Sequence, residues 1–144
     1  MKIYIGSDHA GYELKEKLKV YLSGLNYKIE DMGAFEFKKD DDYPDFIRPV
    51  AQAVADNTES MGIILGGSGQ GEAMSANKIA GARAAIYYGG NLDIIKISRQ
   101  DNNCNVLSLG ARFITEQEAE MAIKIFLETP FSNEDRHIRR IAKI

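Results

Sequence analysis

The chain has 144 residues, of which 44% are hydrophobic and 27% are charged, with a formal net charge of −3. This length predicts one domain with a buried core, and the slight negative charge offers neither nucleic acid nor an anionic membrane a basic surface. No apolar run approaches the length of a membrane span, and the apolar segment after Met1 ends at Gly6, too soon for a signal peptide. We therefore expect a cytoplasmic protein.

Few residues could bind a metal ion. Cys104 is the single cysteine, which excludes an intrachain disulfide and leaves too few ligands for a zinc site built on cysteine. His9 and His137 are the only histidines, and no group of ligand residues surrounds either of them in the sequence. We expect chemistry without a metal ion or other cofactor, and a small molecule or another protein as the partner.

Short apolar runs alternate with longer amphipathic stretches, a pattern typical of parallel strands joined by crossover helices. The first helix shows it most clearly, because Leu14, Leu18, Leu22 and Leu25 recur at every third or fourth position. The sequence therefore predicts a single α/β domain around a five-stranded parallel sheet. In chain order we expect strands at 2–7, 27–33, 61–67, 82–88 and 105–110, and helices up to about Gly24, from Pro44 to about Asn57, at 70–79, at 91–100, at 116–128 after an N-cap at Thr115, and at about 132–143 after Pro130.

Polar segments follow three of the predicted strands. They are "SDHAG" at 7–11, "GGSGQGE" at 66–72 and "ARF" at 111–113. Ligands of open parallel sheets bind beyond the carboxyl ends of the strands, where loops lead into helices. We expect these three segments to converge on one cleft.

The most unusual segment places four glycines within residues 66–71 and follows them with Glu72. Neither G-x-G-x-x-G nor G-x-x-x-x-G-K is matched, because Glu72 occupies the position of the third glycine or of the lysine. The loop can still offer backbone N–H groups to an oxyanion, since glycine adopts the dihedral angles that this requires. The segment predicts an anion cradle beside a carboxylate.

Each polar candidate has a structural and a functional interpretation. Glu72 either complements the dipole of the following helix or removes a proton next to a carbonyl. Asp8 and His9 either cap a helix or contact a ligand. Arg136 and Arg140, four residues apart on one helix face, either form a solvated basic end or bind a phosphate dianion.

A polar corner at Asp101, Asn102 and Asn103 precedes the last predicted strand. It is a turn, unless the order of the strands brings it to the cleft. Cys104 beside it is interpreted as a small packing residue without chemistry.

Six segments together resemble ribose-5-phosphate isomerase B, a family that includes galactose-6-phosphate isomerase subunits. The resemblance covers nearly the whole chain in the order of the family. It implies a Rossmann-like three-layer sandwich, a homodimer or dimer of dimers whose clefts the partner chain completes, and metal-free interconversion of ribose 5-phosphate and ribulose 5-phosphate through an enediolate. The segments are "IGSDHAGYELK" (5–15), "DYPDF" (42–46), "GGSGQGEAMSANK" (66–78), "ARAA" (82–85), "RQDNNCNVLSLGAR" (99–112) and "RHIRRI" (136–141).

The resemblance also implies a role for each candidate residue. Many members carry a cysteine as base at the position of Gly66, whereas this chain resembles the subgroup with the base in the next turn, so Glu72 would move the proton between C1 and C2. Ser68 would help to move protons between the two sugar oxygens. Asp8 and His9 would contact the sugar and its phosphate end, Gly67, Ser68, Gly69 and Gly71 would supply the anion hole, Asn102 would bind the sugar, and Arg112, Arg136 and Arg140 would bind phosphate, the last two from the helix at 132–143 of a neighbouring subunit.

One position departs from the family pattern. The usual ring-opening histidine lies in an "R-x-H-N" segment, and this chain reads "RQDN", with Asp101 in that place. Either Asp101 opens the ring, which we favour, or the enzyme uses the open-chain fraction, or it prefers a different sugar phosphate.

Three questions stay open at this stage. A hexose 6-phosphate such as allose or galactose phosphate is an alternative substrate, and a non-catalytic module that binds a sugar phosphate or a nucleotide is an alternative function. The acidic loop at 36–46 either closes over the substrate or stays solvated, with Tyr43 as a candidate wall of the cleft. The number of subunits, two or four, does not follow from the sequence.

Overall fold

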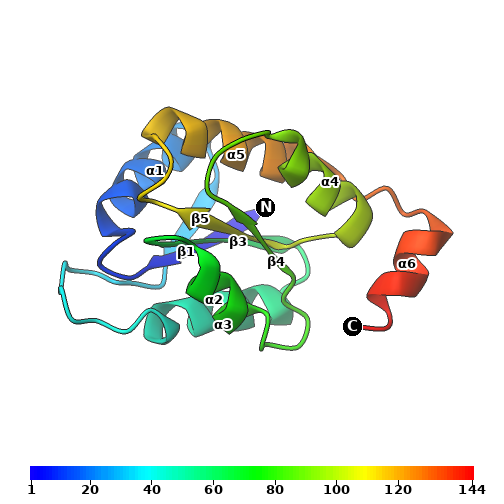
Figure 1. Cartoon of the computed structure of the whole chain (residues 1–144), viewed down its shortest axis with the longest axis horizontal. Helices are drawn as coiled ribbons and strands as arrows, with labels where there is room; N and C mark the ends of the chain where they lie inside the picture. The colour runs from blue at the N-terminus through cyan, green and yellow to red at the C-terminus, as the bar shows by residue number, and fades with distance from the viewer.

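The computed structural model describes residues 1–144 and contains one five-stranded parallel sheet with helices on both faces (Figure 1). The strand order is β2-β1-β3-β5-β4. This architecture confirms the predicted α/β sandwich. The strands are β1 (Lys2–Ser7), β2 (Lys28–Asp31), β3 (Ser60–Gly66), β4 (Ala84–Tyr87) and β5 (Val106–Gly110), and the helices are α1 (Tyr12–Gly24), α2 (Pro44–Asp56), α3 (Gln70–Ala76), α4 (Asp93–Asn102), α5 (Glu116–Glu128) and α6 (Asp135–Ile141). No helix is both long enough and apolar enough to cross a membrane.

Two apolar layers hold the helices against the sheet. Ile3 and Ile5 belong to the layer that also contains side chains of α1, α4 and α5, whereas Tyr4 between them packs with α2 and α3. This alternation follows from the period of two in a strand. Leu18 and Leu22, two of the leucines that predicted the apolar face of α1, are fully buried. Both faces of the sheet are therefore covered.

Local signals fix several helix ends. Thr115 caps α5 as predicted, because its hydroxyl accepts a hydrogen bond from the Glu118 N–H while the Glu118 carboxylate accepts one from the Thr115 N–H. Helix α4 continues past its predicted end at position 100 and stops where Asn103 adopts a left-handed conformation with φ 48°. Asp101 and Asn102 thus lie in the last turn of a helix, which corrects the expectation of a turn at this corner.

Other boundaries differ from the sequence prediction by a few residues. The strands expected at 27–33 and 82–88 are shorter, with four residues each. The last helix begins at Asp135 rather than at position 132, since Asn133 is left-handed with φ 56°. These differences do not change the order of the elements.

The chain leaves the neighbouring strands β1 and β3 toward opposite edges of the sheet. From β1 it passes through α1 to β2 at one edge, and from β3 it passes through α3 to β4 at the other edge. A crevice opens between two strands at such a point, beyond their carboxyl ends. Residues 8–11 and 67–69 form the two loops that border it.

Helix α6 stands apart from the layered body of the molecule (Figure 1). The Ser132 N–H donates to the Gln100 carbonyl and ties the segment before α6 to the end of α4. A hollow of about 690 Å³ with a largely apolar lining lies where Ile141 and Ile144 face residues of β4 and α4. Because α6 packs against so little of the chain, most of its side chains are exposed.

A buried ion pair connects α1 to the last residue of β2. Lys15 is fully buried, and its ammonium donates to both carboxylate oxygens of Asp31 at 2.7 Å. Asp31 also accepts from Lys19 at 2.6 Å and from the Gly33 N–H at 2.9 Å. Burial by itself would raise the pKa of Asp31, but the hydrogen bonds from the two lysines lower it. The pair thereby fixes the start of the loop at 32–43.

Replacing Asp31 by alanine is expected to cost about 3 kcal/mol of folding free energy, because the buried Lys15 ammonium keeps only the partly exposed Glu16 carboxylate, at 3.1 Å, as a partner. Glu30→Ala is the matched control on the same strand, since Glu30 pairs with Lys2 at the surface and its loss should cost at most about 1 kcal/mol. Urea unfolding measures both variants. Equal losses would mean that the buried pair contributes no more than the surface pair.

Candidate active site

A cleft of about 400 Å³ lies at the carboxyl ends of β1 and β3, where the crevice of the sheet was expected. It brings together eight of the predicted site residues from four separate segments. These residues are Asp8, His9, Tyr43, Gly67, Ser68, Gly71, Glu72 and Arg112, and Ala10 and Phe113 complete the lining.

Glu72 lies in the first turn of α3 and is only 4% exposed, although it borders the cleft. Its carboxylate occupies the space above Gly66, where an added β-carbon would overlap it. A glycine at the end of β3 is therefore the residue that lets the carboxylate of α3 fold back over the strand. A first-turn acid that served only the helix dipole would have no need of this space.

The surroundings of Glu72 favour its protonated form. Burial raises the pKa of its carboxyl group, and the nearby charge of Asp8 raises it further, against an opposing effect of the backbone N–H groups of Glu72 and Gly69. A carboxylate with a raised pKa is a stronger base, which suits a group that removes a proton at neutral pH.

This shift predicts how stability depends on pH. The pKa of Glu72 is higher in the folded than in the unfolded state, so its contribution to stability is present at low pH and is lost as the pH rises through the folded value. Glu72→Gln should accordingly raise the Tm at neutral pH, and the gain should vanish below about pH 4, where the carboxyl group is protonated in both states. Thermal unfolding across this range checks the sign. A Tm below that of the wild type at neutral pH would contradict it.

The glycine loop offers free backbone donors beside Glu72. The N–H groups of Gly67, Ser68 and Gly71 donate no hydrogen bond within the chain. Gly69, a further predicted site residue, is not among the residues that line the cleft. Its φ of 76° and the hydrogen bond from the Ser108 hydroxyl to its carbonyl, at 2.7 Å, shape the loop instead. The loop can thus present donors to a developing oxyanion.

Arg112 and Tyr43 cover the glycine loop. The backbone N–H of Arg112 donates to the Gly67 carbonyl at 3.1 Å. The guanidinium of Arg112 also lies close to Gly67, because a β-carbon added there would be 3.2 Å from Nη1. A β-carbon at Gly71 would be 2.8 Å from Cζ of Tyr43, so this ring lies directly against Gly71. Tyr43 is thus a wall of the cleft, as expected.

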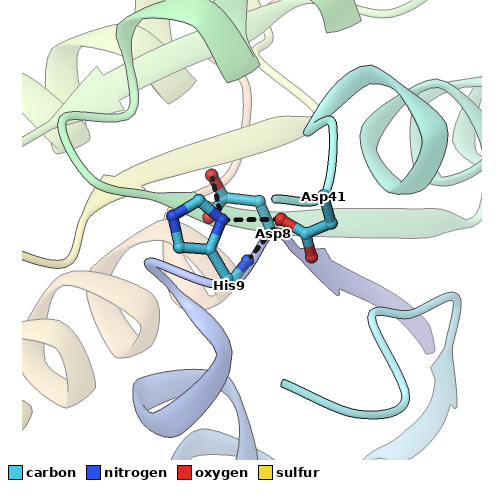
Figure 2. A group of neighbouring side chains, drawn as sticks. All are labelled: Asp8, His9 and Asp41. Atoms are coloured by element: carbon cyan, nitrogen blue, oxygen red, sulfur yellow. Dashed lines mark hydrogen bonds and ion pairs between the residues drawn. The ribbon is translucent and has the colours of Figure 1, made fainter. Parts of the chain in front are cut away.

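Asp8, His9 and Asp41 form a cluster at one side of the cleft (Figure 2). Asp8 does cap the next turn, because one of its oxygens accepts from the N–H groups of Ala10 (2.9 Å) and Gly11 (3.1 Å), yet it also lines the cleft. Asp41 approaches His9 to within 2.6 Å. The side chain of Asp41 comes from the loop after β2, and no sequence signal connects it to His9.

This cluster corrects the expectation that neither histidine has ligand residues nearby. One potential ligand atom from each of the three residues lies within 4.8 Å of the others. The Nδ1 atom of His9, however, faces the Asp41 carboxylate at hydrogen-bond distance, and a nitrogen that carries a proton cannot bind a metal ion. The arrangement fits a hydrogen-bonded pair better than a metal site.

Four predicted residues do not reach this cleft in the same chain: Asp101, Asn102, Arg136 and Arg140. Asp101 and Asn102 form the end of α4, which leads into the amino end of β5. The cleft lies at the other end of the sheet, at the carboxyl ends of β1 and β3. Strand order does not bring this corner to the cleft, because that rule places only the loops that follow strands. Arg136 and Arg140 are exposed on α6, which lies beyond the same end of the sheet as the end of α4 (Figure 1).

No sequence pattern assigned His137 to a site. Its side chain is buried, and its Nε2 atom lies 3.5 Å from a carboxylate oxygen of Asp101 without a hydrogen-bond partner. Asp101, on α4, and His137, on α6, thus form a second pair of titratable groups away from the cleft.

An open parallel sheet with a buried carboxylate, free backbone donors and an arginine at its topological switch point belongs to the class of α/β proteins that bind a ligand at this crevice. The family described as Ribose/Galactose Isomerase matches residues 3–144 of the sequence. The chain belongs to this family.

Individual relatives agree over the full length. A "Ribose-5-phosphate isomerase B" of Mycolicibacterium paratuberculosis is 40% identical over 141 residues, which cover 98% of this chain and 87% of that protein. The crystal structure of ribose-5-phosphate isomerase B from Mycoplasma genitalium with bound ribulose-5-phosphate is similar, with a TM-score of 0.93 and 38% identity over 99% of this chain and 92% of that one. A ribose 5-phosphate isomerase from Thermotoga maritima gives a TM-score of 0.91 and 42% identity over 99% and 95% of the two chains.

Proposed function

We propose that the chain interconverts ribose 5-phosphate and ribulose 5-phosphate through an enediolate, with Glu72 as the base. Glu72 takes the proton from C2 of the open-chain aldose and returns it to C1, while a proton moves from O2 to O1. Ser68, which lines the cleft, assists the transfer between the two oxygens. The backbone N–H groups of Gly67, Ser68 and Gly71 bind the oxygen on which negative charge develops.

The observation that carries this proposal is the position of Glu72. A carboxylate that is buried over a glycine, with a raised pKa and three free backbone donors nearby, is suited to enolisation and poorly suited to holding a phosphate. The names of the relatives give the substrate class.

The phosphate of the substrate needs more positive charge than one cleft supplies. Arg112 is the only arginine or lysine that lines it. Arg136 and Arg140 are exposed on α6, which stands away from its own domain next to a largely apolar hollow. We therefore assign the chain to a homodimer, or a dimer of dimers, in which α6 of a second copy brings these two arginines to the phosphate.

In the completed site, Asp101 and Asn102 of the second copy contact the sugar, and Asp101 opens the furanose ring. Opening requires removal of a proton from the anomeric hydroxyl and delivery of a proton to the ring oxygen. The His137 imidazole lies 3.5 Å from the Asp101 carboxylate, so the pair can share a proton between the two steps.

Steady-state isomerisation of ribose 5-phosphate in chelator-treated buffer tests the proposal, with allose 6-phosphate and galactose 6-phosphate as parallel substrates. Turnover of ribose 5-phosphate is the expected result. Turnover of a hexose phosphate alone would assign the chain to a hexose phosphate isomerase. Binding of ribose 5-phosphate without turnover would make it a sugar-phosphate binding module.

Asp101→Asn is expected to lower ribose 5-phosphate turnover by about 10²-fold, because the amide cannot carry the proton. Ribulose 5-phosphate cannot form a five-membered ring, since its O5 is esterified, so solvent deuterium exchange at C1 of this ketose should stay within about threefold of wild type. Proton NMR in D₂O measures the exchange.

The control is Asp93→Asn at the exposed other end of α4, which should change neither rate. An equal fall of exchange and turnover in Asp101→Asn would place Asp101 in enolisation and would remove it from ring opening.

A further inference from the structure

The structure assigns a positioning role to Asp41, a residue without any role in the function proposed above. We propose that Asp41 fixes the proton of His9 on Nδ1 and so presents Nε2 of the same ring to the substrate. The location of the proton does not depend on the proposed function, whereas the benefit to substrate binding does.

Asp41 is distinguished from its neighbours by burial. It is the one residue of the segment 35–43 that is not exposed, and its side chain retains only 6% exposure. Asp40 and Asp42 on either side are exposed to solvent. A carboxylate leaves water at a considerable cost unless it gains hydrogen bonds in return, so its inward position reflects a specific contact.

That contact is entirely with His9. One oxygen of Asp41 accepts from the His9 backbone N–H at 3.0 Å and faces Nδ1 of its ring at 2.6 Å. The other oxygen is buried and makes no hydrogen bond, so the two bonds to His9 are what hold the carboxylate. Because residues 9 and 41 lie on different loops, the pair also ties the loop after β2 to the loop after β1.

The pair determines which ring nitrogen carries hydrogen. An ionised carboxylate only accepts hydrogen bonds, so the Nδ1 atom at 2.6 Å must be the donor. In a neutral imidazole the second nitrogen then has a free lone pair. Figure 2 shows this nitrogen on the side of the ring that faces away from Asp41, while His9 itself lines the cleft. The group offered to a ligand is therefore Nε2.

The same contact places a wall of the cleft. The loop is fixed at its start, where the Gly33 carbonyl accepts from the Ser7 N–H at 2.8 Å and the Ala34 N–H donates to the Ser7 carbonyl at 2.7 Å. Asp41 holds the loop at its other end, two positions before Tyr43. The buried Asp41 carboxylate thus holds the acidic loop at 36–46 against His9 at the side of the cleft. The neighbouring side chains at 35–40 and 42–43 remain exposed to solvent.

Imidazole NMR tests the location of the proton without any need for turnover. The chain has only two histidines, so ¹⁵N-edited spectra are readily assigned with a His137→Gln variant. At about pH 8, above the ordinary pKa of histidine, wild type should show His9 with a protonated Nδ1. Asp41→Ala should shift His9 toward the Nε2–H form, and Asp41→Asn should keep Nδ1 protonated, because the amide oxygen can accept the same two bonds.

Kinetics test the consequence for substrate. Asp41→Ala should raise the KM for ribose 5-phosphate about tenfold and change kcat by less than about threefold, because His9 contacts the bound sugar phosphate in ground and transition state alike. Asp41→Asn should recover most of the affinity. Asp40→Ala, which removes the same charge from the exposed part of the loop, is the matched control and should behave as wild type.

Three results would overturn the inference. An unchanged His9 spectrum in Asp41→Ala would show that another group places the proton. An equal rise of KM in Asp40→Ala would reduce the effect to loop charge. Loss of the Nδ1–H signal or of affinity on treatment of wild type with a chelator would mean that the cluster holds a metal ion. Absence of turnover in wild type would reject the proposed function, and the spectra would still decide where the proton lies.

Discussion

Glu72→Gln is expected to lower kcat for ribose 5-phosphate by about 10²- to 10⁴-fold, because the amide cannot accept a proton from carbon. KM should change little, since glutamine keeps the size and most of the polar contacts of glutamate. Steady-state assays in both directions should give the same loss of kcat/KM, as the equilibrium constant requires. Calorimetric titration with ribulose 5-phosphate checks that binding survives.

Glu13 supplies a matched control, because it occupies the first turn of α1 as Glu72 does in α3, yet its side chain is 88% exposed. Glu13→Gln should leave kcat unchanged. A similar loss in both variants would indicate a general effect of first-turn charge. Full activity of Glu72→Gln would remove the base from the proposed reaction.

Gly66→Ala is expected to lower kcat by about 10²-fold without touching the substrate, since the added methyl group must push the Glu72 carboxylate out of its place. The fold should persist, because the clash is with the end of one side chain and not with the backbone. Steady-state kinetics and near-UV circular dichroism together separate displaced chemistry from a damaged core.

A double-variant comparison isolates the mechanism of this loss. If Gly66→Ala acts only through Glu72, it should cause no further loss in the Glu72→Gln background. Gly24→Ala, at the end of α1 with no neighbouring atom near the new methyl group, should be fully active. Losses that multiply in the double variant would contradict the steric account.

The sequence predicted those parts of the fold and site that depend on local patterns. Apolar periodicity identified the strands and helices, and Thr115 marked the start of α5 as its N-cap. Because loops after parallel strands meet at one end of the sheet, strand order alone predicts that Asp8 and Glu72 share a cleft, and both line it. The sequence placed Gly66 in the glycine loop, but the overlap of an added β-carbon at Gly66 with the Glu72 carboxylate could not be predicted from it.

Contacts that depend on the path of a loop or on a second chain could not be predicted in this way. Asp41 reaches His9 from 32 positions along the sequence, and neither residue type nor spacing indicates that contact. The distance of Asp101 from the cleft of its own chain could not be predicted either, because strand order says nothing about residues that precede a strand. The proximity of Asp101 to His137 depends on where the segment after α5 places α6 relative to α4.

The most direct measurement of the role of Glu72 is deuterium exchange at C1 of ribulose 5-phosphate in D₂O, followed by proton NMR for wild type and Glu72→Gln. This exchange requires only removal and return of the carbon-bound proton, and it is independent of ring opening and of release of the aldose. We expect exchange with the wild type, and exchange slowed at least about 10²-fold with Glu72→Gln. Equal exchange with both proteins would contradict the assignment of Glu72 as the base.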